Sequence, residues 1–417
     1  MLTAKEIDFI LDHEEGEPER LLLEREKYKD INVPLCVNCI IARKKIKKRL
    51  PLWYATPGII YPNRLSAEQC SSQAAAQYKT SVLQKALEER GCATPYTGAD
   101  LTAGLGVDTY CLSSITSHFH SYEKEAEICH ALEENMKLLG RDNISVTNIE
   151  ISPETIEQLP KELTFVYADP ARRYSNDRER RKYSIAASTP NLTEITGLLL
   201  ERCEVVMAKF SPMADIRESL RLLPQITELH IVALDNECKE LLAIMQKSSG
   251  APRSSPLIKG INIVTSGGQS YTRSISLTLQ EEERANVTYS SVPGKYLYEP
   301  DRHILKCGAF KLLSERYRLD KLSKSSHLYT SGEIVPDFPG KIFIVRELCN
   351  YSRKRMTELA SRYPFINLVS RNFPIESNRL KSLYKIKDGG TLYLFATTLH
   401  DSSKVLIVAQ PLTSQAI

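Results

Sequence analysis

Between residues 96 and about 280, short apolar runs alternate with segments of helical periodicity. Strands are predicted at Ala99–Thr102, His118–Tyr122, Ile144–Thr147, Thr164–Ala168, Val205–Lys209 and Leu229–Leu234. The clearest helices between them are Lys124–Leu139 and Met213–Leu222. Strands that alternate with helices indicate an α/β fold, in which parallel strands are joined by right-handed crossovers. We therefore expect a doubly wound sheet, which a hairpin at Gly260–Ser266 and Tyr271–Leu279 closes.

The region before this sheet, residues 1–95, is predicted to be a helical domain. Three prolines in and around Trp53–Tyr61 predict a loop or an extended crossing there. Ser66, with Gln69 three residues later, is predicted to cap a helix that continues to Tyr78.

After the sheet, the regular alternation of strands and helices gives way to small α+β segments. Residues 281–325 are predicted to be a small connecting α+β segment of ferredoxin-like type, and residues 326–417 a separate α+β module. Strands of the module are predicted at Lys341–Glu347, Leu368–Arg371, Gly390–Thr398 and Val405–Val408, with a helix at Tyr351–Tyr363. The chain is thus expected to divide into residues 1–95, 96–280, 281–325 and 326–417.

The composition is that of a globular protein. The 417 residues are 42% apolar and 25% charged, and no apolar run reaches the ~18 residues that a membrane span needs. The first twenty residues are acidic and lack the apolar core of a secretory signal, so a cytoplasmic protein without a membrane partner is expected. The ten cysteines are then expected to be reduced thiols. A net charge of +4 permits a nucleic-acid partner but does not require one.

The stretch from Asp100 to Thr109, with the sequence DLTAGLGVDT, carries the clearest candidate chemistry. It is a strand end followed by a tight turn of small residues that opens a helix. Gly104 and Gly106 let the backbone approach a ligand closely, and Asp100 at the strand tip can bind an ammonium group. The glycine spacing differs from the dinucleotide motif G-x-G-x-x-G, which disfavours a nicotinamide dehydrogenase. The alternative is a structural βα turn.

Further polar positions follow the next two strands. Glu123, after the second strand, can accept both ribose hydroxyls of an adenosine ligand, or can serve as an acid at a helix N-terminus. Asn148, after the third strand, is placed to contact the adenine edge. Thr102, Ala103 and Asp108 of the turn complete the predicted cofactor-binding set.

The fourth strand delivers Asp169 to the same edge of the sheet, and Pro170 stiffens the loop that follows. A carboxylate at this position can accept a hydrogen bond from an exocyclic amine and so orient the nitrogen lone pair toward a methyl sulfonium. The turn, Glu123 and Asp169, in this order at strand ends, together predict a site for S-adenosylmethionine (SAM). The alternative for Asp169 and Pro170 is a structural turn.

Arginines that follow this loop are the candidate substrate-binding residues, because guanidinium groups hold phosphates and base edges. They are Arg172, Arg173, Arg178 and Arg181. Two other basic runs, Arg43–Arg49 and Arg353–Arg355, are equally compatible with solvated faces. Cys36-x-x-Cys39 lacks a second Cys or His pair at zinc spacing, so no metal site is expected.

These motifs resemble those of class I SAM-dependent methyltransferases. Residues 100–108 are similar to motif I, Tyr122-Glu123 to the ribose motif, and Asp169-Pro170 to motif IV. Several segments resemble bacterial class I methyltransferases that carry a C-terminal THUMP-like domain, namely Leu65–Ser72, Asp169–Arg173, Lys209–Met213 and Leu394–Thr398. The resemblance covers nearly the whole chain. It implies a Rossmann-like methyltransferase sheet with an N-terminal helical region and a small C-terminal α+β module, SAM as cofactor, and RNA (tRNA or rRNA) as partner.

One departure concerns motif IV, which in amino-methylating enzymes continues with proline and an aromatic residue. Here Ala171 and Arg172 stand in those places, so Tyr174 or Tyr183 is the candidate to stack on a flipped base. The sequence nevertheless predicts a methyltransferase that acts on an exocyclic amine of structured RNA, with Asp169, Pro170 and Arg172 as catalytic residues. The alternative is a non-catalytic RNA-binding or assembly protein with the same fold.

Overall fold

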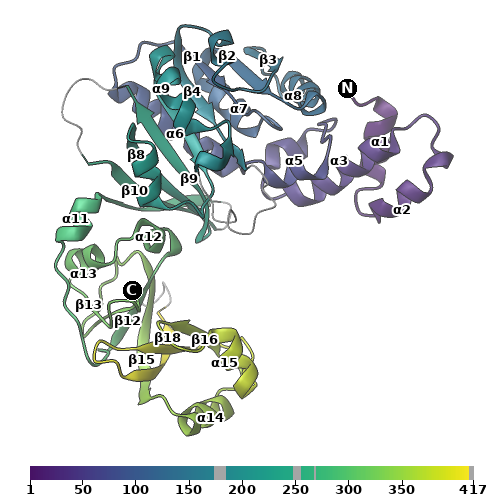
Figure 1. Ribbon diagram of the computed structural model, residues 1–417. Coiled ribbons are helices and arrows are strands. Elements are labelled where there is room, and N and C mark those ends of the chain that lie inside the picture. The colour runs from purple at the N-terminus through teal and green to yellow at the C-terminus, as the bar shows by residue number, and fades with distance from the viewer. Residues whose placement is uncertain (173–184, 248–254, 267–268, 413–417) are drawn as a thin grey trace. The chain divides into compact units, whose positions relative to one another are not determined.

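The computed structural model describes residues 1–172, 185–247, 255–266 and 269–412 (Figure 1). The chain forms two compact units. The first comprises Met1–Val232 and Lys239–Pro256, and the second comprises Ala233–Cys238 and Leu257–Ile417.

Among the described residues of the first unit, seven strands form a sheet in the order β8-β9-β7-β4-β1-β2-β3. Their bounds are β1 Tyr96–Asp100, β2 Thr116–Glu123, β3 Ile144–Asn148, β4 Leu163–Ala168, β7 Cys203–Phe210, β8 Ile226–Leu234 and β9 Glu237–Gln246. Strands β3, β2, β1, β4 and β7 pair in parallel, whereas β9 is antiparallel to β7. Because β2 and β4 flank β1 on opposite sides, the strand order reverses there, and ligands of such sheets bind at this reversal.

Helices connect these strands. They are α7 Val107–Leu112, α8 Ala126–Leu138, α9 Leu192–Arg202 and α10 Ile216–Leu222, with 3-10 helices at Ser113–Ile115, Ile156–Gln158 and Ile185–Ala187. A short ribbon pairs β5 Ala171–Arg172 with β6 Ser188–Thr189. All six predicted strands are present in this unit, and β9 is an additional strand that the sequence analysis missed.

The N-terminal region is helical, as predicted. Its helices are α1 Ala4–Asp12, α2 Pro18–Leu23, α3 Val33–Ile46, α4 Pro51–Ala55, α5 Arg64–Gln69 and α6 Gln73–Glu89, with a 3-10 helix at Arg25–Lys27. Helix α4 replaces part of the predicted loop, because Pro51 lies in its first turn, where a missing N–H does no harm. The predicted cap was also wrong: Ser66 lies inside α5, and Ser72 caps α6.

The N-terminal helices share their core with the sheet. One buried cluster includes Ile40 and Trp53 of the helices together with Leu105 of the β1–α7 turn and Leu132 of α8. The side chain of Asn135 on α8 also donates to Ile60 O at 2.9 Å and accepts from Ile60 N at 2.8 Å. The helices are therefore one packed body with the sheet, which positions them beside the strand ends.

From Leu257 onward, the second unit consists of an antiparallel hairpin followed by a separate sheet. The hairpin consists of β10 Leu257–Ser266 and β11 Gln269–Leu277, followed by α11 Leu279–Arg284. The sheet has the order β13-β14-β12-β15-β18-β17-β16. Its strands are β12 Tyr296–Pro300, β13 Asp320–Lys321, β14 Tyr329–Ser331, β15 Gly340–Asn350, β16 Asn367–Arg371, β17 Tyr393–Thr398 and β18 Lys404–Pro411. The remaining helices are α12 Arg302–Cys307, α13 Lys311–Tyr317, α14 Arg353–Arg362 and α15 Ser377–Tyr384.

Strand β12 joins the two halves of this sheet, because it pairs antiparallel with β15 from Tyr296↔Ile344 to Pro300↔Gly340 and with β14 on its other side. The division predicted at 325/326 falls between β13 and β14, which pair with each other. The predicted fold class, a Rossmann-like α/β sheet with a helical N-terminal region and a C-terminal α+β module, is confirmed. The predicted domain limits stay predictions. Within the described part of the chain, no helix has the length and apolar character that crossing a membrane requires.

Substitution by alanine is predicted to have opposite effects on stability at two glycines of the first unit. A Cβ at Gly98 in β1 would lie 2.4 Å from Cζ of the buried Phe165 ring, whereas a Cβ at Gly197 on the exposed face of α9 would meet nothing within 4 Å. We expect Gly98→Ala to lower the free energy of unfolding by about 1–3 kcal/mol through overpacking. Gly197→Ala should raise it by roughly 0.5–1 kcal/mol, because alanine is the better helix former. Chemical denaturation of both variants measures the difference, and equal stabilities would contradict this packing of β1 on β4.

Candidate functional site

The turn between β1 and α7 is shaped by two glycines in the left-handed region, Gly104 with φ 53° and Gly106 with φ 92°. A Cβ at Gly106 would lie 2.2 Å from Leu132 Cδ1, so the turn is pressed against α8 at this point. A Cβ at Gly104 would meet nothing nearer than Thr102 O at 3.9 Å. Gly104 therefore leaves the surface of the turn open to a ligand.

Asp100, the last residue of β1, is buried at the base of this turn. Its carboxylate accepts hydrogen bonds from Thr102 N at 3.0 Å and Thr109 Oγ1 at 2.8 Å. Burial raises its pKa to about 7, the negative charges of Asp108 and Asp169 add to the shift, and the two hydrogen bonds offset only part of it. Asp100 thus holds the turn in shape and can change charge near neutral pH.

Glu123, the last residue of β2, connects the turn to the neighbouring strand. Its Oε2 accepts from Gly104 N at 2.8 Å, and its Oε1 accepts from Glu125 N at 2.9 Å. Each oxygen retains a lone pair for a further donor. Asn148, the last residue of β3, donates its side-chain amide to the backbone oxygens of Glu123 and Lys124 at 2.7 and 2.9 Å. Asn148 therefore braces the loop that holds Glu123.

Asp169 follows β4 and is attached to the turn by its backbone, since its N–H donates to Thr102 Oγ1 at 2.6 Å. Its carboxylate forms an ion pair with Lys209 at the end of β7. The sequence analysis did not predict Lys209 as a partner of Asp169. The ion pair places an ammonium group beside the Asp169 carboxylate. Arg172 ends the short strand β5, and the other predicted substrate-binding residues, Arg173, Arg178 and Arg181, lie outside the described residues, as do Tyr174 and Tyr183.

A cleft of about 680 Å³ opens at these strand ends. Of the predicted residues, it is lined by Asp100, Thr102, Ala103, Gly104, Gly106, Asp108, Glu123 and Asp169. Helix α5 and the segment after it supply a second wall, which includes Ser66, Gln69 and Ser71. A volume of this size is typical of a pocket for a cofactor or a small molecule. Asn148 and Pro170 are not among the described residues that line it.

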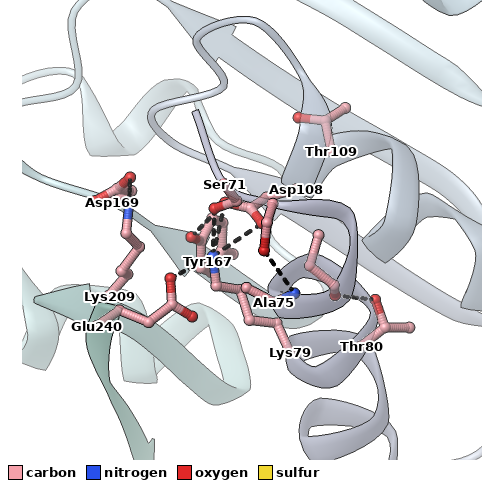
Figure 2. A network of polar contacts seen from close by, with 12 residues as sticks. Ser71, Ala75, Lys79, Thr80, Asp108, Thr109, Tyr167, Asp169, Lys209 and Glu240 are labelled. Atoms are coloured by element: carbon pink, nitrogen blue, oxygen red, sulfur yellow. Dashed lines mark hydrogen bonds and ion pairs between the residues drawn. The ribbon is translucent and has the colours of Figure 1, made fainter. Parts of the chain in front are cut away.

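A cluster of buried charges adjoins the cleft, because Ser71 and Asp108 belong to both (Figure 2). Lys79 of α6 is fully buried, and its Nζ lies 2.9 Å from Asp108 Oδ1, 3.1 Å from Glu240 Oε2 and 2.6 Å from Ser71 Oγ. Asp108 also accepts from Tyr167 OH at 2.8 Å. Asp108, which was predicted to bind cofactor, therefore both lines the cleft and takes part in this network.

The lysines and carboxylates of the cluster shift one another's pKa values. Burial by itself lowers the pKa of Lys79, but Asp108 and Glu240 raise it above its ordinary value. Burial likewise acts to lower the pKa of Lys209, and Asp169, Glu240 and Asp108 together raise it. Burial raises the pKa of Glu240, against the effect of the two lysines. Both lysines are therefore ammonium groups at neutral pH, held by carboxylates.

The sequence analysis did not identify Lys79, Tyr167, Lys209 or Glu240 as site residues. Lys79 lies on a helix outside the strand ends, and Glu240 lies on β9, the strand that was missed. A signal for β9 exists in the apolar run Leu241–Met245, whose five residues are all buried. Lys209 ends a predicted strand at the edge that carries Asp169, so its position could have been read from the sheet topology.

Comparison with known proteins gives matches to two family models and a strong match to a solved structure. Residues 296–339 match a family model described as a ferredoxin-like domain, and residues 340–411 one described as THUMP domain-like. The crystal structure of a candidate methyltransferase from Porphyromonas gingivalis W83 is similar over 99% of this chain and 100% of that chain, at 30% identity and a TM-score of 0.84. No curated protein matches the chain.

Two other solved structures are less similar, and their TM-scores are too low to support a conclusion about this chain. A candidate RNA methyltransferase from Pyrococcus horikoshii matches at 12% identity and a TM-score of 0.29, over 46% of this chain and 85% of that chain. The N-terminal domain of human METTL16 in complex with SAH matches at 13% identity and a TM-score of 0.33, over 41% and 69%.

The buried charge cluster predicts a large effect of a single substitution on α6. Lys79→Met leaves Asp108 and Glu240 buried without their shared cation, so we expect it to lower the free energy of unfolding by about 3–5 kcal/mol. Lys85→Met on the same helix removes an exposed lysine, 65% accessible, and should change stability by less than ~0.5 kcal/mol. Guanidinium denaturation of both variants tests the difference. A Lys79→Met protein as stable as the control would show that the cluster carries no buried charge.

Proposed function

Because the chain belongs to the family of methyltransferase-like proteins that end in a ferredoxin-like and a THUMP-like domain, we propose that it transfers a methyl group from SAM to structured RNA (tRNA or rRNA). The observation that carries the proposal is the convergence of the Gly104 turn, Glu123 and Asp169 on one cleft. These three features belong to the ends of β1, β2 and β4, where a sheet with this strand order binds its ligand.

The residues of the cleft fit SAM as cofactor. Glu123 is anchored through one backbone donor on each oxygen and can still accept two ribose hydroxyls. Asp100 lies beside the turn and, when ionised, favours a cationic ligand group. Gly104 leaves the space above the turn free. When bound, SAM supplies a methyl group on a cationic sulfonium, and the chain's own residues hold the cofactor and align the acceptor.

Support for RNA as substrate comes from the second unit. Its THUMP-like part carries the basic helix α14, on which Arg353, Lys354 and Arg355 are exposed. Exposed basic groups on one helix suit phosphate contacts, whose strength falls steeply with salt. The alternative, a non-catalytic RNA-binding protein of the same fold, shares this surface but has no use for the ion-paired carboxylate at the cleft.

The acceptor expected from the sequence is an exocyclic amine, oriented by Asp169, with Pro170 stiffening its loop and Arg172 positioning RNA. Asp169 lines the cleft, in keeping with that role. Its ion pair with Lys209 bears on the choice of acceptor, because a neighbouring ammonium disfavours positive charge on a nitrogen.

The decisive experiment measures the transfer of a methyl group from SAM to RNA. The full chain is incubated with SAM labelled in its methyl group and with total RNA from cells that lack the protein. Label in RNA is the expected result. SAM binding and RNA binding without label in RNA would favour the non-catalytic alternative, and absence of SAM binding would contradict the cofactor assignment.

Glu123 provides the quantitative prediction for the cofactor. Glu123→Ala removes the acceptor for the ribose hydroxyls, and loss of a hydrogen bond to a charged group costs about 1.5–3 kcal/mol. SAM affinity should therefore fall roughly ten- to a hundredfold. Glu133→Ala on the exposed face of α8 is the matched control and should leave SAM affinity unchanged. Calorimetry measures both, and equal affinities for wild type and Glu123→Ala would remove Glu123 from the site.

A further inference from the structure

A carboxylate that lines the cleft is paired with an ammonium group that is itself largely buried. Asp169 lines the cleft, one third of its side chain is accessible, and it is ion-paired with Lys209. Lys79, Asp108 and Glu240 lie to one side of this pair (Figure 2), within electrostatic range of Lys209. Two lysines and three carboxylates thus form one group of neighbouring charges, of which Asp108 and Asp169 line the cleft.

An amine acceptor requires a carboxylate but has no requirement for the ammonium group beside it. An amine nitrogen becomes positively charged as it is methylated, so a lone carboxylate stabilises its transition state and an ammonium destabilises it. A hydroxyl oxygen has the opposite requirement. It must lose a proton while it attacks, which calls for a base, and the oxygen becomes more negative, which calls for a cation. The pair of Asp169 and Lys209 supplies both.

From this arrangement we infer that the acceptor is a hydroxyl group, and that in RNA it is the 2′-hydroxyl of a ribose. The inference rests on the proposed function for the substrate being RNA, whose internal nucleotides each carry this one hydroxyl. Asp169 is assigned as the base and Lys209 as the group that stabilises the oxygen. Lys79, Asp108 and Glu240 are positioning residues, which hold Lys209 and the floor of the cleft.

The step balances without any further reactant. The oxygen forms a bond to the methyl carbon as the bond from that carbon to sulfur breaks, and the electron pair of the latter stays on sulfur. The hydroxyl proton passes to the Asp169 carboxylate and then to water, which reaches this partly exposed side chain. While Asp169 carries the proton, Glu240 remains as a counter-charge for Lys209, and its Oε1 has no hydrogen-bond partner among the described residues.

The product decides between the acceptors. The full chain is incubated with methyl-tritiated SAM and total RNA from cells that lack the protein, and the RNA is then hydrolysed in alkali. Alkaline cleavage needs a free 2′-hydroxyl, so a methylated ribose leaves its label in an alkali-resistant dinucleotide. This result is expected. Label in mononucleotides would overturn the hydroxyl acceptor and leave the methyltransferase intact, whereas RNA without any label would overturn the proposed function as well.

Variants of Asp169 give a second, independent test. An amide can still accept a hydrogen bond but takes up no proton, so for a hydroxyl acceptor Asp169→Asn should lose kcat as severely as Asp169→Ala, at least about a hundredfold. SAM affinity should change much less, as calorimetry will show. If Asp169→Asn kept a large part of the activity that Asp169→Ala loses, Asp169 would only orient the acceptor, and the assignment as base would be wrong.

Lys209 is tested by kcat and its pH dependence. Lys209→Met should lower kcat by about 10²–10³-fold, the usual effect of losing a group that stabilises an oxyanion. Its residual kcat should rise with pH above neutrality, because hydroxide then ionises the acceptor in place of the missing cation. Lys161→Met, at an exposed position, is the control and should leave kcat unchanged. A Lys209→Met enzyme with unchanged kcat, or with a low kcat that stays flat with pH, would contradict the role of Lys209.

Discussion

The position of the site depends on one buried ammonium group, that of Lys79. It ties three elements that are far apart in the sequence, since it contacts Asp108 on α7 and Glu240 on β9 from its own place on α6. A buried ion pair is a poor source of net stability, because desolvation offsets most of the attraction, but breaking one is costly. The cluster therefore acts chiefly as a geometric constraint, which fixes α6 against the strand ends and sets the floor of the cleft.

Because of this constraint, the N-terminal helices are a structural part of the cleft. Helix α5 and the segment that joins it to α6 form one wall of the cleft, and Ser71 in that segment donates to Asp108 at 2.8 Å. The helices also share a hydrophobic core with the β1–α7 turn and α8. The turn, the wall and the buried charges are consequently one rigid arrangement, in which the shape of the cleft follows from packing throughout the first unit.

Much of the fold and part of the site could be predicted from the sequence. Strand ends, the glycine turn and the two acids Glu123 and Asp169 are local features, and parallel topology brings them together at one edge. What could not be predicted are partners fixed only by tertiary contact. Asp108 follows the turn so closely that it suggested a ligand contact, yet its partners come from α6 and β4. Asn148 has the right strand end, but its amide is used by backbone oxygens of the neighbouring strand's loop.

The pairing of β12 with β15 has a consequence for how the second unit folds. The ferredoxin-like and THUMP-like segments match separate family models, but β12 completes the hydrogen bonds along one edge of β15 over five residue pairs. If the THUMP-like segment were produced alone, that edge would be left with unpaired backbone groups and would become a template for pairing with other chains. The two segments should therefore unfold as a single cooperative block, so that the boundary between the two family models is no boundary for folding.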